Sequence, residues 1–146
     1  MVSTKGQYAL ISTKGRYALR VMIDIAEQNS DKFISLEEIA LRQGISKKYL
    51  EMIVKLLVQR NLIKGIRGKG GGYQLTRQPQ EYTVYEILEL TEGTLACVTC
   101  LKSNAPPCER SAFCQTLPMW KKFDALTREF FSGITLQNLL DKNFNV

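Results

Sequence analysis

The chain has 146 residues, 45% apolar and 23% charged, so it can bury the core of one domain and is not a disordered polymer. No apolar run approaches the roughly 18 residues of a membrane span, and the N-terminus lacks the apolar stretch of a secretory signal, so we expect a soluble, cytoplasmic protein without a membrane partner. The net charge is +6. Histidine is absent, which excludes His-dependent triads and His-ligated zinc within one chain, and we therefore do not expect an enzyme.

A nearly identical motif of eight residues occurs twice at the N-terminus, as STKGQYAL at 3–10 and STKGRYAL at 12–19. Two copies nine residues apart lie on opposite faces of a helix, so both cannot dock on the same surface. We interpret residues 1–11 as an N-terminal extension, a candidate cloning or start-site artefact. Only the second copy continues into a helical stripe, made of Tyr17, Ala18, Val21, Met22, Ile25 and Ala26.

Residues 34–65 predict a helix-turn-helix. Ser35 and Glu38 form a capping box before a short apolar stripe, and Gly44 is typical of a helix C-cap. Ser46 can cap the next helix. Two helices joined by a short glycine-containing turn form a helix-turn-helix, although generic helical hairpins share the pattern. The apolar side of the second helix holds Leu50, Ile53, Val54, Leu57 and Val58.

The positive charge is concentrated in residues 42–77. This stretch has nine basic side chains and one acidic side chain, for a net +8, whereas the rest of the chain sums to −2. A block of one sign indicates a polyanionic partner, the alternative being an ordinary basic surface. The second helix of a helix-turn-helix enters the major groove of DNA, where an acid can accept from cytosine N4. We therefore predict DNA contacts from Ser46, Lys47, Lys48, Glu51 and Lys55.

The sequence LIKGIRGKGGGYQLT, residues 62–76, predicts a hairpin wing. Five of residues 65–72 are glycine, which suits a tight tip between two short strands. A phosphate-binding P-loop would need a Gly-Lys-Ser/Thr ending and a following helix, but Tyr73 and Leu75 indicate a strand. Arg67 and Lys69 are then offered at the tip as further DNA contacts.

A cysteine-rich loop follows the next predicted helix, which Thr83 and Glu86 open with a capping box and Gly93 ends. Helical periodicity disappears over residues 94–115, which contain all the cysteines in the spacing C-x2-C-x7-C-x5-C. Four thiolates in a reducing compartment suit either an iron–sulfur cluster or zinc, whereas incidental buried cysteines would be scattered more widely. The candidate ligands are Cys97, Cys100, Cys108 and Cys114.

A long helix is predicted from Thr116 to Gly133, and a short final helix from Leu136. One side of the long helix holds an aromatic stripe. Such a stripe is typical of a core, and here we expect that core to be shared with a second subunit. The stripe contains Leu117, Trp120, Phe123, Thr127, Phe130 and Phe131.

These motifs resemble the Rrf-type winged-helix regulators, a family that includes IscR, NsrR and CymR. The resemblance lies in STKGRYALRVMIDIA, ISLEEIALRQGISKKYLEMIVKLL and LIKGIRGKGGGYQL, and its most specific piece is the wing sequence R-G-x-G-G-G-Y. It implies a homodimer paired through the long C-terminal helix and bound to a pseudo-palindromic operator in double-stranded DNA. It also implies a cysteine loop that holds an iron–sulfur cluster; we favour [2Fe–2S] over [4Fe–4S], with zinc as the alternative.

The resemblance to the IscR-like cysteine pattern holds only in part. That pattern has three cysteines with five residues between successive ones, followed by a histidine three residues after the last. Cys108 and Cys114 match its second and third cysteines, and Cys100 is the natural first, although seven residues separate it from Cys108. Leu117 stands at the histidine position and cannot be a ligand. The resemblance therefore leaves Cys97 as the candidate fourth ligand, the alternative being an acidic or solvent oxygen.

We predict a mainly α-helical chain with a small β-hairpin. Its parts are the extension at 1–11, a winged helix-turn-helix DNA-binding domain at 12–93, a cysteine loop that binds the cluster at 94–115, and a dimerisation helix with a C-terminal tail at 116–146. The predicted function is a transcriptional regulator, a repressor by hypothesis, that senses iron–sulfur cluster status and controls genes of cluster biogenesis. The alternatives are a nitric-oxide or redox sensor of the same fold and a zinc-stabilised nucleic-acid-binding module.

Overall fold

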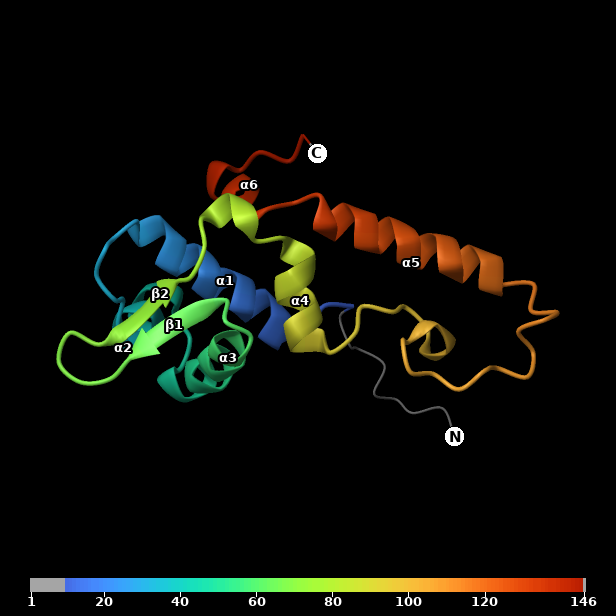
Figure 1. The fold of residues 1–146 in the computed structure, drawn as a ribbon, viewed down its shortest axis with the longest axis horizontal. Helices are drawn as coiled ribbons and strands as arrows, with labels where there is room; N and C mark the ends of the chain where they lie inside the picture. Colours follow the sequence, from blue (N-terminus) through green and yellow to red (C-terminus); the bar gives the residue numbers. More distant parts are fainter. Residues whose placement is uncertain (1–9, 146) are drawn as a thin grey trace.

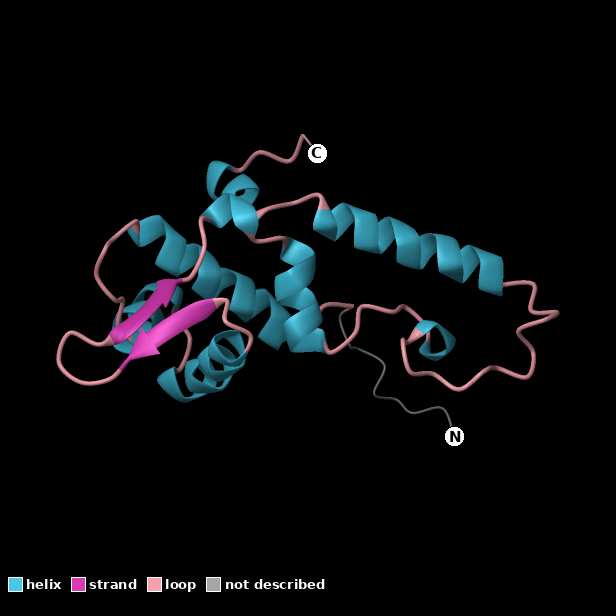
Figure 2. Cartoon of the chain, in the orientation of Figure 1, coloured by secondary structure: helices cyan, strands magenta, loops and turns pink. Residues whose placement is uncertain are grey.

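The computed structural model describes residues 10–145, and the predicted extension lies outside the described residues except for Leu10 and Ile11. The chain is mostly helical with one two-stranded sheet, which confirms the predicted fold class (Figures 1 and 2). Among residues 10–145, no helix combines the length and apolar character that crossing a membrane requires. The elements are α1 (Thr13–Gln28), α2 (Leu36–Gln43), α3 (Lys47–Gln59), β1 (Ile63–Ile66), β2 (Gly72–Leu75), the 3₁₀ helix η1 (Pro79–Glu81), α4 (Val84–Glu92), the 3₁₀ helix η2 (Thr99–Leu101), α5 (Leu117–Ser132) and α6 (Leu136–Asp141).

The helix-turn-helix begins and ends where its capping residues predict. The Ser35 hydroxyl accepts from the backbone N–H of Glu38, and the Glu38 carboxylate accepts from the backbone N–H of Ser35, which completes the capping box. Gly44 ends α2 in the left-handed conformation with φ of 63°, which glycine adopts without steric cost. Ser46 caps α3 by accepting from the backbone N–H of Tyr49.

The wing is an antiparallel hairpin that is tied to the strand-like residue before α2. Ile63 lies opposite Leu75 and Ile66 opposite Gly72. Ile34 and Tyr73 exchange two backbone hydrogen bonds of 2.9 and 2.8 Å, which extends the ladder beyond the hairpin. A Cβ atom on Gly72 would lie 2.2 Å from the carbonyl oxygen of Ile34, so this close approach requires glycine.

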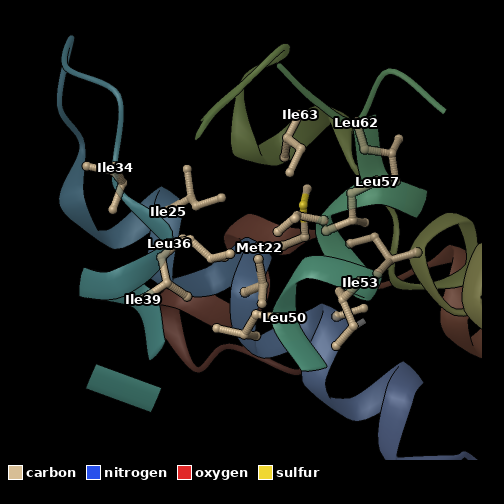
Figure 3. Packing of buried hydrophobic residues seen from close by; sticks show 14 of the residues in the cluster. Met22, Ile25, Ile34, Leu36, Ile39, Leu50, Ile53, Leu57, Leu62 and Ile63 are labelled. Carbon is tan, nitrogen blue, oxygen red and sulfur yellow. The ribbon is translucent and has the colours of Figure 1, made fainter. Parts of the chain in front are cut away.

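One hydrophobic core joins the first three helices to the wing and the last helix (Figure 3). Met22, Leu50 and Leu57 are fully buried in it. Leu136 of α6 is fully buried there too, although α6 is the last helix in the sequence. The predicted apolar side of α3 is correct except at Val58, which is 39% exposed because it lies at the edge of the buried face. A smaller cluster of Val84, Leu88 and Ile134 joins α4 to the segment before α6.

The entry to α4 differs from the predicted capping box. The Thr83 hydroxyl accepts from the backbone N–H of Glu86 as expected. The Glu86 carboxylate, however, accepts from the guanidinium of Arg77 at 2.7 Å instead of from the backbone of Thr83. An ion pair to a residue nine positions earlier therefore takes the place of half the box, because a charged donor is the stronger partner.

Helix α5 reaches away from the winged domain, and the cysteine loop lies near its outer end (Figure 1). None of its residues is buried within the chain. Its inner end is anchored by Phe131, which packs against the smaller cluster.

Candidate nucleic-acid interface and cysteine loop

The outer face of α3 presents the predicted recognition residues to solvent. Lys48, Glu51 and Lys55 are exposed, whereas Leu50 and Ile53 on the opposite face are fully buried. The hydroxyl of Ser46 is occupied in the helix cap. The α3 surface is therefore fixed by its buried side, and its exposed side is free to contact a partner.

Lys47 has a partner within the chain that the sequence pattern does not predict. Its ammonium group donates to the carboxylate of Glu37 in the first turn of α2. This hydrogen bond and ion pair raise the pKa of Lys47 and lower the pKa of Glu37. The pair joins the N-terminal ends of the two helices of the motif. Sequence periodicity gave no signal for it, because neither residue belongs to an apolar stripe.

A buried polar network sets how α2 packs on α1. The side chain of Asp24 is 1% exposed, and its carboxylate accepts from the Arg42 guanidinium through Nε and Nη2 and from the Gln43 amide at 2.8 Å. Arg20 in turn donates to the Gln43 side chain at 3.0 Å. Bonding to Asp24 raises the pKa of Arg42. Arg42 was counted in the basic block, but its charge is used to neutralise a buried acid.

The wing offers Arg67 and Lys69 at an exposed tip, as predicted. Gly68 and Gly70 have φ values of 90° and 77°, and the N–H of Gly71 closes the turn onto the carbonyl of Gly68 at 2.9 Å. A shallow groove runs between α3 and the wing, with Lys55 on one side and Arg67 on the other. The groove therefore has one cation from α3 and one from the wing, the two elements predicted to contact DNA.

The base of the wing is held by the buried hydroxyl of Tyr82. This hydroxyl accepts from the backbone N–H groups of Thr76 and Arg77, each at 2.9 Å, and donates to the carbonyl of Leu62 at 2.7 Å. The Arg77 guanidinium lies over the Tyr82 ring, 4.3 Å from its centre. One side chain therefore connects both ends of the hairpin to the entry of α4.

The four cysteines are free thiols. The thiol of Cys97 donates to the carbonyl of Trp120 at 3.8 Å, and Cys100 lies exposed in η2. The Thr116 hydroxyl lies 3.4 Å from the sulfur of Cys114, and this hydrogen bond lowers the pKa of Cys114. Within residues 10–145, no three Cys, Asp or Glu side chains are grouped closely enough to hold a metal ion. The structure therefore does not bring the predicted ligands, Cys108 included, together at one point.

The end of α4 touches the start of α1. The carboxylate of Glu92, the last residue of α4, accepts from the backbone N–H of Ser12 at 3.0 Å and from its hydroxyl at 2.7 Å. A Cβ atom on Gly15 would meet that carboxylate at 2.3 Å, so the glycine of the second STKG copy is needed for this approach. The contact fixes the end of α4, from which the cysteine loop starts, to the start of α1.

The aromatic stripe of α5 divides into two sides. Trp120 and Phe131 are half-buried on the side toward the rest of the chain. A second row of apolar side chains, spaced i, i+4, i+7 and i+11, is exposed along one face, with Phe130 at 58%. Only two of its four members belong to the aromatic stripe predicted from the sequence. The row, which we call the α5 apolar row, consists of Met119, Phe123, Leu126 and Phe130.

Comparison with known proteins gives one consistent result. Residues 11–142 match the Rrf2 family, described as "Iron-dependent Transcriptional regulator". The chain is 31% identical to the HTH-type transcriptional regulator IscR of Aliivibrio salmonicida, over 97% of this chain and 78% of that protein. The solved structure of CymR (YrzC), the global cysteine regulator of B. subtilis, is similar with a TM-score of 0.73 and 32% identity over 90% of this chain and 96% of that chain. The structure of T. potens IscR is similar with a TM-score of 0.71 and 31% identity, over 96% and 90%.

Proposed function

The chain belongs to the Rrf2 family of transcriptional regulators, and from that membership we propose a homodimeric regulator that binds operator DNA and responds to iron–sulfur cluster status. Members of this family and the similar proteins above are regulators and not enzymes. The genes it controls, by hypothesis those of cluster biogenesis, its action as a repressor and its cytoplasmic location are parts of the proposal. So are the boundaries of the DNA-binding domain at 12–93, the loop at 94–115 and the dimerisation region at 116–146, although α6 within this last region packs into the core of the winged domain.

The groove between α3 and the wing carries the proposal of DNA binding. Lys55 and Arg67 line it from two elements, and Glu51 lies at the same surface. Phosphate contacts supply affinity, and base contacts in the major groove supply specificity. We assign Lys47, Lys48, Lys55, Arg67 and Lys69 to phosphates or guanine edges, Glu51 to cytosine, and Ser46 to the correct start of the recognition helix.

The α5 apolar row supports the proposal of a homodimer. Four large apolar side chains on one face of a helix, spaced as in a two-helix seam, are costly in water and stable against a second copy. A two-fold dimer presents two α3 helices, so half-sites about one helical turn apart, roughly 34 Å, would form a pseudo-palindromic operator.

The donor chemistry of the cysteine loop fits an iron–sulfur cluster, but its described arrangement does not. Cys97, Cys100, Cys108 and Cys114 are the residues that would hold a cluster, whereas no three ligands are gathered in residues 10–145. When bound, a cluster supplies a group whose presence depends on iron and oxidants. Gathering the thiols would reorder the segment after Gly93, which follows Glu92 and its contact with Ser12. Because Glu92 ends α4 directly before this segment, its contact with Ser12 is our proposed route by which a change in the loop would reach α1.

DNA binding is tested by selecting fragments from genomic DNA and measuring their affinity by fluorescence anisotropy at several salt concentrations. We expect Lys55→Ala and Arg67→Ala each to weaken binding and to lower the slope of log K against log salt by about 0.9. Lys121→Ala, which removes the same charge from α5, is the matched control. The proposal would be refuted if the wild-type protein enriched no genomic fragment and its affinity for DNA did not depend on the salt concentration.

The cluster is tested by iron and sulfide analysis of protein purified without oxygen. We expect both elements in the wild type and their loss in Cys108→Ser and Cys114→Ser. Zinc without sulfide would instead identify the zinc-stabilised alternative. Unchanged iron and sulfide in both variants would show that the ligand assignment is wrong.

A redox or nitric-oxide sensor of the same fold is the second candidate, and Cys114 favours it. Thr116 lowers the pKa of this thiol, which favours the reactive thiolate. A metal-free protein whose operator affinity changes on mild oxidation, and not in Cys114→Ser, would support this candidate over the cluster.

A further inference from the structure

Helix α3 begins with two lysines at its N-terminal end, where positive charge destabilises a helix. Lys47 and Lys48 are the first two residues of α3, and its first turn contains no acidic residue. The N-terminal end of a helix carries partial positive charge, so lysines there are unfavourable and anions are favourable. This placement makes the start of α3 attractive to any nearby oxyanion.

A carboxylate of the same chain already lies at the start of α3. The Glu37 carboxylate accepts from the ammonium of Lys47, across the turn between α2 and α3. Glu37 has no part in capping α2, because Ser35 and Glu38 form that capping box. The side chains of Glu37 and Lys47 are 65% and 51% exposed, so the pair is open to solvent and contributes little to stability.

We propose that Glu37 is a positioning residue that competes with a DNA phosphate for Lys47, so that DNA binding breaks this pair and Glu37 holds the affinity below what α3 could reach. The proposal rests on the proposed DNA-binding function of α3. Carboxylate and phosphate oxygens accept the same charge-assisted hydrogen bond from an ammonium group. Once displaced, the Glu37 carboxylate faces the DNA and repels it.

The main test is Glu37→Gln, which keeps the shape of the side chain and removes its charge. We expect operator and non-specific DNA to bind about two- to fivefold more tightly, the range that an exposed ion pair is worth. The slope of log K against log salt should steepen by up to about 0.9, because Lys47 then releases a counterion without an internal competitor. The gain should shrink at high salt, where exposed charges are screened.

Two further variants separate this effect from a general change in charge. In a Lys47→Met background, Glu37→Gln should bring a clearly smaller gain, because the competitor no longer has a lysine to hold. Asp141→Asn removes one negative charge from α6, which lies on the other side of α1 from α3 in the view of Figure 1, and should leave affinity unchanged. An equal gain with and without Lys47 would overturn the proposal, and so would an equal gain from Asp141→Asn.

An NMR titration of the Glu37 carboxyl provides a readout that does not depend on affinity. In the free protein its pKa should lie below the ordinary value and rise in Lys47→Met, since bonding to Lys47 is the main cause of the lowering. With saturating operator DNA the pKa of Glu37 in the wild type should also rise. DNA that binds tightly without moving this titration would refute the role of Glu37 alone, whereas the absence of any DNA binding would refute the proposed function.

Discussion

Two regions of the molecule differ in where their apolar side chains lie. The winged domain buries them, whereas the segment formed by the cysteine loop and α5 exposes them. In the winged domain, apolar stripes of α1, α2 and α3 converge with the wing and α6 until side chains such as Leu57 and Met22 have no exposed surface. In α5 no residue is buried, and large apolar side chains such as Phe123 face outward. A buried core indicates a unit complete in itself, while an exposed apolar row indicates a surface whose partner is another molecule.

The largest expected effect is in the winged domain. Leu57→Ala should lower the free energy of unfolding by about 2–5 kcal/mol, because it leaves a cavity in a fully packed core. Chemical denaturation followed by circular dichroism measures the loss. Leu126→Ala on α5, the same substitution at a residue that is 54% exposed, is the control and should cost far less in a monomeric sample. Equal losses would remove the distinction between the two regions.

The α5 apolar row should respond in association instead of folding. We expect Phe130→Glu to raise the dimer dissociation constant by about 30-fold or more, equivalent to about 2 kcal/mol, because it puts a charge in the seam. Sedimentation at micromolar concentration measures this change. Lys121→Glu introduces the same charge on the opposite face of α5 and should leave association intact. A wild-type protein that sediments as a monomer would contradict the proposed seam.

A smaller effect is expected at the base of the wing. Tyr82→Phe keeps the ring but leaves the N–H groups of Thr76 and Arg77 without their acceptor and the Leu62 carbonyl with only the Thr76 hydroxyl, 3.2 Å away, as a donor. The free energy of unfolding should fall by about 1–3 kcal/mol. Hydrogen exchange should show faster opening of the hairpin. Tyr85→Phe on α4, which removes only a 3.4 Å hydrogen bond to Glu89, is the matched control, and an equal loss there would argue against a special role for Tyr82.

The smallest effect concerns reactivity in the cysteine loop. Thr116→Val removes the hydroxyl that stabilises the Cys114 thiolate, so the pKa of Cys114 should rise. Below that pKa the thiolate fraction falls as the pKa rises, and alkylation of Cys114 near neutral pH should slow a few-fold. Mass spectrometry after timed alkylation gives the rate at each cysteine. Cys108 in the same sample is the internal control, and a matching change there would indicate a rearranged loop.

The sequence predicted the winged domain well because its signals are local. Ser35, Gly44 and Ser46 mark helix ends through contacts within a few residues, and apolar periodicity marks the buried faces. Contacts between distant polar residues gave no such signal, as the pairs Arg42–Asp24 and Arg77–Glu86 show.

The cysteine loop and α5 were less predictable for a different reason. The loop has no repeating pattern, so spacing identifies four thiols but not their arrangement. In α5 the pattern found apolar residues correctly, but periodicity does not say whether the same chain or another covers them. The predicted stripe combines the half-buried side of α5 with part of the exposed row, and it lacks Met119 and Leu126, which complete that row.

The backbone bonds between Ile34 and Tyr73 have a consequence for the kinetics of recognition. They attach the wing to the residue before α2, and the close approach at Gly72 leaves no room for the hairpin to slide. The recognition helix and the wing then arrive at a duplex as one preformed body, and no separate ordering step delays the encounter. We expect association rates set by diffusion and charge steering, with differences between DNA sequences expressed mainly as different lifetimes of the complex.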